Sequence, residues 1–374
     1  MMINRARIFL AALAAFGLFA TVSLSAEPEK AEGRRLYVAE PGIRDLVEYG
    51  GHGLLVYDID RGHKLIKRIP TAGLRPNGKP DNVKGVCASA ATGRIHISTT
   101  KTLTCLDLVT EKILWERSYE GGCDRMALSP DGKTIYLPSF EGDHWNVVDA
   151  IDGSVIAKIT PKSGAHNTVF GADGKHVYLA GLRSPLLTVA DASKHVAERT
   201  IGPFSAAIRP FTVDGRQTRC YATVNGLLGF EIGDLKTNKP VQRVVVSGFQ
   251  PGPVKRHGCP SHGVGLTPDE KEIWVVDGHN QQVHIFDITV DPPRQTTSIP
   301  LREEPGWITF SIDGQYAYPS TGEVIDVKTK KTVTTLSDEK GSPVLSEKMV
   351  EIDFEAGKPV RTGDQFGIGR VIDR

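Results

Sequence analysis

The sequence lacks the short motifs that mark most well-known catalytic and cofactor sites. It contains no HExxH zinc motif, no P-loop, no dinucleotide-binding glycine fingerprint at a strand–helix junction and no GxSxG nucleophile elbow. It also contains no CxxC pair and no CxxCH sequence, which argues against a zinc ribbon, a redox CxxC motif and covalently attached haem. We therefore assign no cofactor-binding residues from motifs alone.

Cysteine is scarce, and net charge is almost absent. The chain has 45 basic and 44 acidic residues, and removing Arg5 and Arg7 with the first 26 residues leaves 43 against 44. This balance gives no electrostatic footprint for nucleic acid or an anionic membrane, so we expect a small molecule or a protein as partner.

In an oxidising compartment the cysteines allow one or two disulfides with a thiol left over, and the pairing stays open. The five are Cys87, Cys105, Cys123, Cys220 and Cys259.

The only long apolar run lies at the N-terminus. Arg5 and Arg7 precede the run from Ile8 to Val22, and the small residues Ser25 and Ala26 follow it. The run is short for a membrane span, and no second one follows it. We predict a signal peptide over residues 1–26 and a periplasmic or secreted mature protein, with a retained N-terminal anchor as the alternative.

The rest of the chain repeats a unit of about forty residues. The repeat is clearest in LSPDGKTIYLPSF (128–140), FGADGKHVYLAGL (170–182) and FSIDGQYAYPST (310–321). Each unit contains several short strands and cannot bury both of its faces alone, so the copies must pack on one another. A radial array of small sheets is therefore expected.

Aligning the repeats gives seven units of four strands. The second strands are predicted at 36–39, 95–98, 135–138, 177–180, 220–223, 273–276 and 317–320, and the third strands close at Asp58, Asp107, Asp149, Asp191, Glu231, Asp287 and Asp326. The first unit lacks a first strand, and VEIDFEAGK (350–358) near the C-terminus resembles one. We predict an all-β, seven-bladed β-propeller of four-stranded antiparallel blades over residues 27–374, with this C-terminal strand closing the ring.

These repeats resemble a known family. SPDGKTIYL (129–137), followed by VVDAIDGSVIAKI (147–159), is similar to the YVTN-repeat, or YncE-like, extracytoplasmic β-propellers. The resemblance covers residues 34 to about 336 and implies a seven-bladed ring, WD40-like in architecture, outside the cytoplasm. It implies little about activity, because propellers host binding modules, enzymes and electron-transfer subunits alike.

The alignment brings several polar residues to one height around the ring. Eight residues before the glycine of each first turn, the repeats carry Asp124, His166 and His262 at equivalent positions, and Arg125 follows in the next column. Imidazole and carboxylate groups can act as acid and base or bind a metal. We name His166, His262, Asp124 and Arg125 as candidate catalytic residues.

Loops between second and third strands add further histidines on the same predicted rim. His144 lies in FEGDHWN (140–146) and His279 in DGHNQQ (277–282), with His52 in a longer loop. Together with His166 and His262, His144 and His279 form the candidate set for a divalent transition metal such as zinc, copper, manganese or iron. The alternative is that a histidine at the head of a first strand only hydrogen-bonds the neighbouring blade.

One further segment bears on whether the protein binds a quinone cofactor. CLDLVTEKILW (105–115) resembles the tryptophan-docking repeat of pyrroloquinoline-quinone dehydrogenases at Asp107, Thr110, Lys112 and Trp115. Those enzymes repeat the motif around the ring, whereas this chain has one copy and four tryptophans. The aspartate and threonine are equally expected to build an ordinary turn.

Three functions remain open at this point. The first is a binding module that holds a small molecule or a protein through one face of the ring and acts as a monomer. The second is a metal-assisted lyase or lactone hydrolase with a histidine-rich site at the channel mouth. The third is an electron-transfer or dehydrogenase subunit resembling the amine-dehydrogenase propellers.

Overall fold

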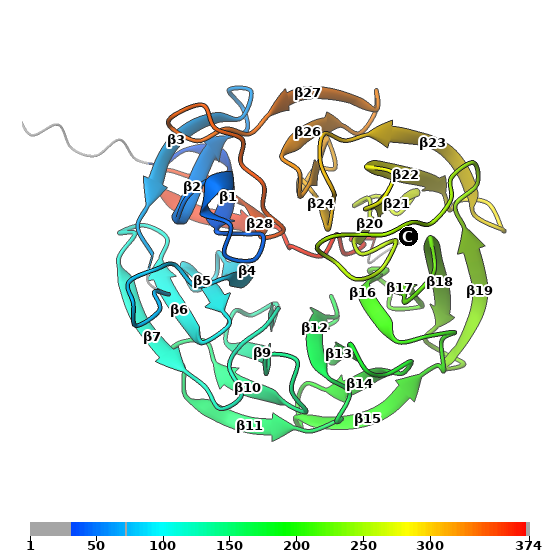
Figure 1. The fold of residues 1–374 in the computed structure, drawn as a ribbon. Coiled ribbons are helices and arrows are strands. Elements are labelled where there is room, and N and C mark those ends of the chain that lie inside the picture. The colour runs from blue at the N-terminus through cyan, green and yellow to red at the C-terminus, as the bar shows by residue number, and fades with distance from the viewer. Residues whose placement is uncertain (1–30, 72, 372–374) are drawn as a thin grey trace, which may run out of the picture. The chain divides into compact units, whose positions relative to one another are not determined.

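The computed structural model describes residues 31–71 and 73–371, and the predicted signal peptide lies outside them. The described residues form seven antiparallel sheets arranged as a ring around a central channel (Figure 1). The predicted all-β, seven-bladed propeller is therefore confirmed. Its only helix within these residues is the single 3-10 turn η1 (Val47–Tyr49), and no described helix could cross a membrane.

Each blade contains four strands that follow one another in the chain, except the first. Blade 1 contains β28 (Met349–Glu355), β1 (Gly33–Glu40), β2 (Gly53–Asp58) and β3 (Lys64–Ile69), with β29 (Lys358–Thr362) as a fifth strand beside β28. Blade 2 contains β4 (Val83–Ser89), β5 (Arg94–Thr99), β6 (Thr102–Asp107) and β7 (Ile113–Ser118), and blade 3 contains β8 (Ala127–Leu128), β9 (Thr134–Pro138), β10 (Trp145–Asp149) and β11 (Val155–Ile159). Blade 4 contains β12 (Ala165–Phe170), β13 (His176–Gly181), β14 (Leu187–Asp191) and β15 (Val196–Ile201), and blade 5 contains β16 (Ile208–Val213), β17 (Arg219–Val224), β18 (Gly229–Asp234) and β19 (Lys239–Val245). Blade 6 contains β20 (Val264–Leu266), β21 (Glu272–Asp277), β22 (Gln282–Asp287) and β23 (Arg294–Pro300), and blade 7 contains β24 (Ile308–Phe310), β25 (Tyr316–Pro319), β26 (Glu323–Asp326) and β27 (Lys331–Thr335).

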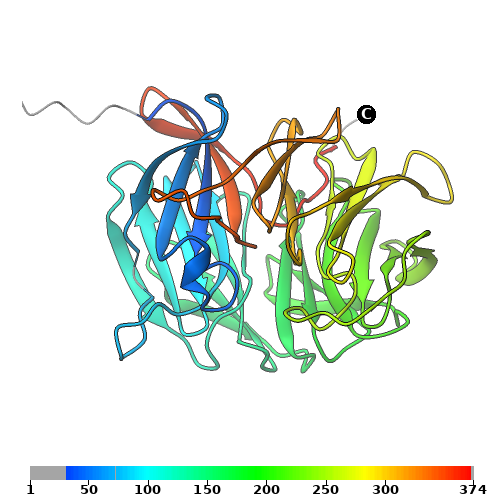
Figure 2. The ribbon, with the colours of Figure 1, turned by 45° about the horizontal axis from the view of Figure 1, so that its top comes forward.

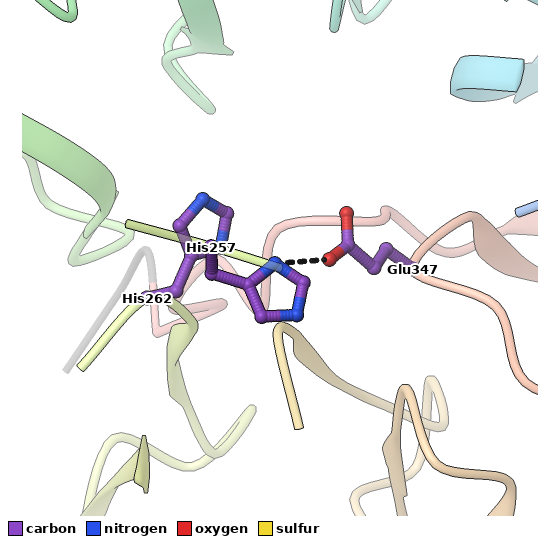
Figure 3. Close-up of side chains that lie close together, drawn as sticks. All are labelled: His257, His262 and Glu347. Carbon is purple, nitrogen blue, oxygen red and sulfur yellow. Dashed lines mark ion pairs between the residues drawn. The ribbon is translucent and has the colours of Figure 1, made fainter. Parts of the chain in front are cut away.

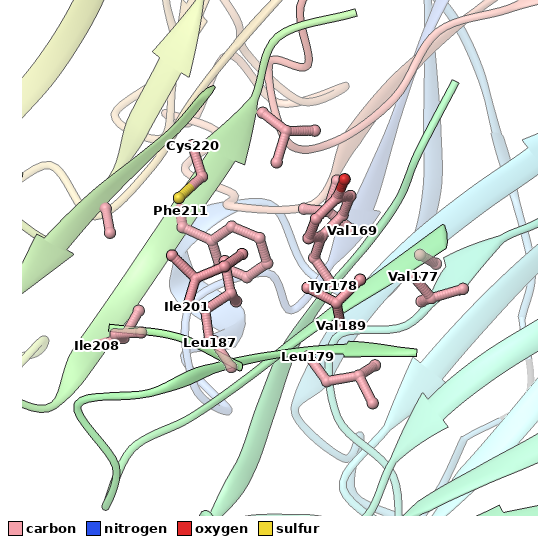
Figure 4. Packing of buried hydrophobic residues seen from close by; sticks show 14 of the residues in the cluster. Val169, Val177, Tyr178, Leu179, Leu187, Val189, Ile201, Ile208, Phe211 and Cys220 are labelled. Carbon is pink, nitrogen blue, oxygen red and sulfur yellow. The ribbon is translucent and has the colours of Figure 1, made fainter. Parts of the chain in front are cut away.

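Burial falls from the channel outward. All six residues of the innermost strand β12 are buried, whereas the outermost strand β7 has no buried residue. Apolar side chains of adjacent blades pack between the sheets, as Tyr178 and Leu187 of blade 4 do with Phe211 of blade 5 (Figure 4). The innermost strands are thus held rigidly by neighbours on both sides, which makes their first residues well-placed anchors for a site.

The turn after each first strand is set by its side chains. In blade 3, the Asp131 carboxylate accepts hydrogen bonds from the Ser129 hydroxyl (2.5 Å) and the Lys133 backbone N–H (3.1 Å). Gly132 has a φ of 72°, and a Cβ at this position would lie 2.1 Å from the Ser89 hydroxyl oxygen of the preceding blade. The PDG sequence therefore determines both the shape of the turn and its close approach to the preceding blade.

The turn after each third strand depends on an aspartate, and here one sequence prediction was wrong. The Asp149 carboxylate accepts the Ile151 N–H (2.6 Å), and the Asp107 carboxylate accepts the Thr110 N–H (2.6 Å), so the quinone-like segment forms an ordinary turn. In blade 5 the third strand ends at Asp234 rather than Glu231, because Asp234 binds the N–H groups of that turn. Glu231 instead accepts the Ser205 N–H (2.9 Å).

The C-terminal strand closes the ring as predicted. Strand β28 pairs antiparallel with β1 from Gly33↔Phe354 to Val38↔Met349. Its apolar side chains Val350, Ile352 and Phe354 are buried in the cluster between blades 1 and 2. The first strand of the chain, β1, and the last two strands, β28 and β29, therefore lie in one sheet, which removes the edge that an open ring would expose.

Residues 363–371 then cross the centre of the ring, where Figure 1 shows them in red. The Gln365 side chain accepts the Val86 N–H (3.2 Å) and donates to the Met126 carbonyl (3.1 Å), and its own carbonyl accepts the Trp307 indole N–H. Further along, the Gly367 carbonyl accepts the Leu266 N–H (2.8 Å). This segment, which we call the channel tail, thus joins innermost strands from several blades, and Figure 2 shows the same red segment lying between the two sides of the ring.

The five cysteines are all free thiols, so neither of the possible disulfides is formed. Four are buried and Cys87 is partly buried. Burial raises the pKa of each thiol well above its usual range, which keeps the thiols protonated and unreactive.

Candidate functional site

A polar cavity of about 430 Å³ opens at the mouth of the channel, where the innermost strands begin. Its walls come from the heads of these strands and from the loops that lead into them. The side chains that define its character are Arg44, Lys84, Arg125, Glu141, His166, Arg209, Lys255, Arg256, His257, His262, Glu347 and Lys348. Seven of these twelve are lysine or arginine and only two are acidic, so the cavity is strongly cationic.

His166 and Asp124 form the first pair in this cavity. His166 Nδ1 lies 2.7 Å from Asp124 Oδ2, while Lys84 Nζ lies 3.3 Å from Asp124 Oδ1. Because Nδ1–H donates to the carboxylate, Nε2 of His166 keeps its lone pair. Burial lowers the pKa of His166, and Asp124 offsets this only in part, so the imidazole is neutral at neutral pH.

Arg125 is a buried part of the cavity lining. Its guanidinium Cζ lies 3.5 Å from the centre of the Trp307 ring, and Nη2 lies 2.7 Å from Glu347 Oε2. Trp307 in turn binds the carbonyl of Gln365 and packs against Phe366, with ring centres 6.0 Å apart. The channel tail therefore supports Arg125 through Trp307.

Glu347 is held by two cations at once. Its Oε2 contacts Arg125 and also Lys348 Nζ, at 2.9 Å, and Lys348 Nζ additionally donates to the Gly42 carbonyl (2.7 Å). Burial would raise the pKa of Glu347, but Lys348, His257 and Arg125 outweigh it and hold the pKa well below its usual range. Burial lowers the pKa of Lys348 to about 7.

His257 and His262 lie beside Glu347 (Figure 3). His257 Nδ1 is 3.2 Å from Glu347 Oε1, and the two imidazole rings have centres 4.8 Å apart. His262 Nδ1 donates to the Gly306 carbonyl (2.8 Å), which leaves its Nε2 with a free lone pair. Burial lowers the pKa of both histidines, and that of His262 falls well below its usual range.

The loop that carries His257 is fixed by Glu304 of the following segment. The Glu304 carboxylate accepts the backbone N–H groups of Lys255 and Arg256, each at 2.8 Å. The chain between β19 and β20 is thereby folded over the channel mouth and presents three consecutive polar residues, 255–257, to the cavity. A buried carboxylate thus positions cationic side chains at the rim.

The structure brings together His166, His262, Asp124 and Arg125 at one cavity, as their shared position in the repeat predicts. It does not bring the predicted loop histidines there. His144 is bound by its own loop and by the segment between β7 and β8 instead, with Nδ1 2.7 Å from Asp143 Oδ1 and Nε2 3.2 Å from the Glu120 carbonyl. His279 is exposed and its Nδ1 lies 3.2 Å from the Pro253 carbonyl, and neither it nor His52 lines the cavity. The catalytic and metal-binding roles themselves remain predictions.

Sequence reasoning missed His257, Glu347 and Lys348. His257 lies in a long loop outside the repeat, and the other two lie just before the closing strand, where no repeat position exists to align them. A signal was present in HGCPSH (257–262), which spaces two histidines five residues apart at the entry to an innermost strand.

Neither models of known protein families nor curated proteins give a match to this chain. Among solved structures, the Kuenenia stuttgartiensis hydrazine synthase is similar with a TM-score of 0.56 and 17% identity, over 75% of this chain and 86% of that one. The dihydro-heme d1 dehydrogenase NirN in complex with DHE is similar with a TM-score of 0.59 and 14% identity, over 93% of this chain and 78% of that one. At these identities the likeness supports the propeller fold alone, and membership of the YVTN-repeat family stays a prediction.

Proposed function

We propose that this protein is an extracytoplasmic binding propeller that takes a small polyanion, carrying carboxylate or phosphate groups, at the mouth of its channel. The observation that carries the proposal is the excess of cationic side chains around one cavity. Asp124, Glu303 and Glu304 lie behind the lining, and burial lowers the pKa of Lys348 to about 7; even so, the other six lysine and arginine side chains outnumber the five carboxylates. A concave site with convergent charges of one sign is suited to a ligand of the opposite sign.

Three of the cations are free to meet a ligand. Within residues 31–71 and 73–371, Arg44, Arg209 and Lys255 form no ion pair with any carboxylate, whereas Arg125, Lys84 and Arg256 do. Arg44 donates to the Arg256 carbonyl (2.9 Å), and Arg209 donates to the Asn225 side chain (2.6 Å). These bonds orient the guanidinium groups without neutralising them, which favours binding of an anion between them.

Calorimetric titration with mono-, di- and tricarboxylates, phosphate esters and uncharged analogues tests this proposal. We expect the dianions and trianions to bind, and the Arg44→Gln/Arg209→Gln double variant to bind about tenfold or more weakly, because two charge-assisted hydrogen bonds are lost. The matched control is Arg216→Gln, an exposed arginine outside the cavity, which should bind as the wild type does. Equal affinity in all three proteins, or no affinity for any anion, would contradict the proposal.

A carboxylate-bearing tetrapyrrole belongs in the same titration. One structural neighbour is the dihydro-heme d1 dehydrogenase NirN in complex with DHE, although a likeness of 14% identity carries no activity to this chain. A Soret band that persists after gel filtration would narrow the ligand class to tetrapyrroles. If no Soret band persists, the alternative of an electron-transfer or dehydrogenase subunit loses its support.

A second candidate function is a lyase or hydrolase acting on the bound anion, and the Asp124–His166 pair favours it. A neutral imidazole held by a buried carboxylate can accept a proton from a substrate that the arginines have oriented. If this is correct, His166→Gln keeps the affinity of the wild type for its ligand but abolishes turnover. Loss of binding and turnover together would assign His166 to binding.

Export and oligomeric state belong to the same proposal. A signal peptide over residues 1–26 would place the site outside the cytoplasm, and the intact mass of the purified native protein tests whether the chain begins near Glu27. We propose that the protein binds its ligand as a monomer, and light scattering during the titration measures this.

A further inference from the structure

His257, His262 and Glu347 have the arrangement expected of metal ligands. One ligand atom from each lies within 4.8 Å of the others, although the residues come from two segments about 90 positions apart. Figure 3 shows the His257 ring turned toward the Glu347 carboxylate. Two histidines and a glutamate are a ligand set used by catalytic zinc sites, which keep a fourth position open.

The three groups approach one another without satisfying their hydrogen-bonding capacity. Glu347 Oε1 and His257 Nε2 are buried, and neither has a hydrogen-bond partner among the described residues. His257 Nδ1 is 3.2 Å from Glu347 Oε1, yet this contact does not have hydrogen-bond geometry. Buried polar atoms left in this way are costly in a folded protein, and a cation bound by Glu347 Oε1 and by His257 Nδ1 would satisfy the carboxylate oxygen.

The spacing agrees with tetrahedral coordination. With bonds of about 2.1 Å, two ligands of a tetrahedral ion lie about 3.4 Å apart, close to the separation of Nδ1 and Oε1. The longest separation in the set is 4.8 Å, so one imidazole would have to move by roughly 1 Å to complete the geometry. Such a shift requires a side-chain rotation and no change in the strands.

The groups that would orient the two imidazoles on a metal are already in place. The His262 Nδ1–H donates to the Gly306 carbonyl, which aims Nε2 as a ligand. His257 Nε2 lies 4.0 Å from Glu304 Oε1, so coordination through Nδ1 would leave Nε2–H pointing at this carboxylate. Carboxylates and carbonyls that orient metal-bound imidazoles in this way are a general feature of metal sites.

The surrounding charges decide what must complete the site. Arg125 and Lys348 both contact Glu347 Oε2, so Oε1 can bind a metal without breaking either contact. A dication next to these cations needs a compensating anion, and His257, His262 and Glu347 all line the cationic cavity that would admit one. We propose that His257, His262 and Glu347 bind one divalent transition metal of the zinc type, and that the anion in the cavity supplies its fourth ligand. The second half of this statement rests on the proposed anion-binding function, and the first does not.

Titration of tag-free protein with zinc chloride and cobalt(II) chloride tests the metal site. We expect one equivalent to bind, with the visible cobalt bands of a four-coordinate site, and about 100-fold or greater loss of affinity in His257→Gln and in His262→Gln. His144→Gln and His279→Gln are matched controls from the same face and should bind as the wild type does. Thermal melts of each variant show that loss of metal binding is not loss of folding.

The outcomes separate the two proposals. Absence of zinc and cobalt binding at millimolar concentration, or equal losses in the His144 and His279 variants, would overturn the metal site while leaving anion binding untouched. If metal binds, adding the anion found by calorimetry should raise metal affinity at least fivefold, and the metal should raise anion affinity by the same factor. Metal binding without this coupling would keep the metal site and overturn the shared ligand.

Discussion

Replacing Ile352 by alanine tests whether the C-terminal strand holds the ring together. Ile352 lies in β28, is fully buried, and packs in the cluster shared by blades 1 and 2. A buried isoleucine-to-alanine change costs about 2–5 kcal/mol, from the lost apolar contact and the cavity left behind. Since a domain is stable by only about 5–15 kcal/mol in total, this is a large fraction of the free energy of unfolding.

The matched control is Val360→Ala in the neighbouring strand β29. Val360 is 40% exposed, so its replacement should change the free energy of unfolding by no more than about 0.5 kcal/mol. Urea unfolding followed by tryptophan fluorescence and by circular dichroism gives both values, and coincident transitions show that the ring unfolds as one unit. An Ile352→Ala protein with the midpoint of the wild type would refute the reasoning.

A larger perturbation extends the same argument. A chain that ends at Lys348 loses Met349, Val350, Ile352, Phe354 and Phe366, all of which are buried. At about 1.5–3 kcal/mol for each buried side chain, the loss is on the order of 8–15 kcal/mol, comparable with the whole stability of a domain. We expect this chain to lack a cooperative transition altogether.

Two further predictions concern the channel tail and pH. Gln365→Leu should lower the free energy of unfolding in urea by about 2–4 kcal/mol, because the Val86 N–H and the Met126 carbonyl lose their buried partner. The control Arg370→Leu, at the partly exposed end of the channel tail, should lower it by less than about 1 kcal/mol. Equal effects of the two changes would mean that the tail does not bind through Gln365. Burial raises the pKa of Glu351 to about 8, and neighbouring Asp353 adds to this, so the folded protein holds this proton more tightly than the unfolded chain. The resulting stability is present at low pH and is lost as pH rises through about 8, so between pH 6.5 and 8 the wild type should lose roughly 1–2 kcal/mol relative to Glu351→Gln. Burial lowers the pKa values of His63 and His96 to about 4, below this window, whereas Lys348, with a pKa of about 7, titrates within it but is present in both proteins. Parallel pH profiles of the two proteins would show that Glu351 is not responsible.

The repeat explains why part of the site was predictable. Asp124, Arg125, His166 and His262 stand at equivalent positions before or at the head of innermost strands, and because every blade repeats the same geometry, equal sequence position means equal height in the channel. The same logic located the closing strand, since a unit without its first strand requires one from elsewhere. The alignment gave the wrong end for the third strand of blade 5, at Glu231, because the repeat is degenerate there and Asp234 accepts the N–H groups of the turn.

The remainder of the site depends on segments that do not repeat. His257 is placed by hydrogen bonds from its loop to Glu304, and Glu347 by the path of the chain into β28, and neither has a counterpart in other blades. His144 and His279 illustrate the opposite case. Neither side chain lines the cavity: His144 contacts Asp143 and the Glu120 carbonyl, and His279 contacts the Pro253 carbonyl. Sequence position can place a loop, whereas side-chain direction depends on local partners.

The channel tail has a consequence for how the protein is made. Ribosomes deliver the chain from its N-terminus, so β28 and the residues beneath Trp307 emerge after the other blades have been synthesised. Until then, the edge of β1 that pairs with β28 is unpaired, and Trp307, next to the cavity, lacks its contact with the channel tail. A nascent or prematurely terminated chain therefore exposes the β1 edge and lacks the Gln365 contact to Trp307, so the ring can close only after the C-terminal strand has been made.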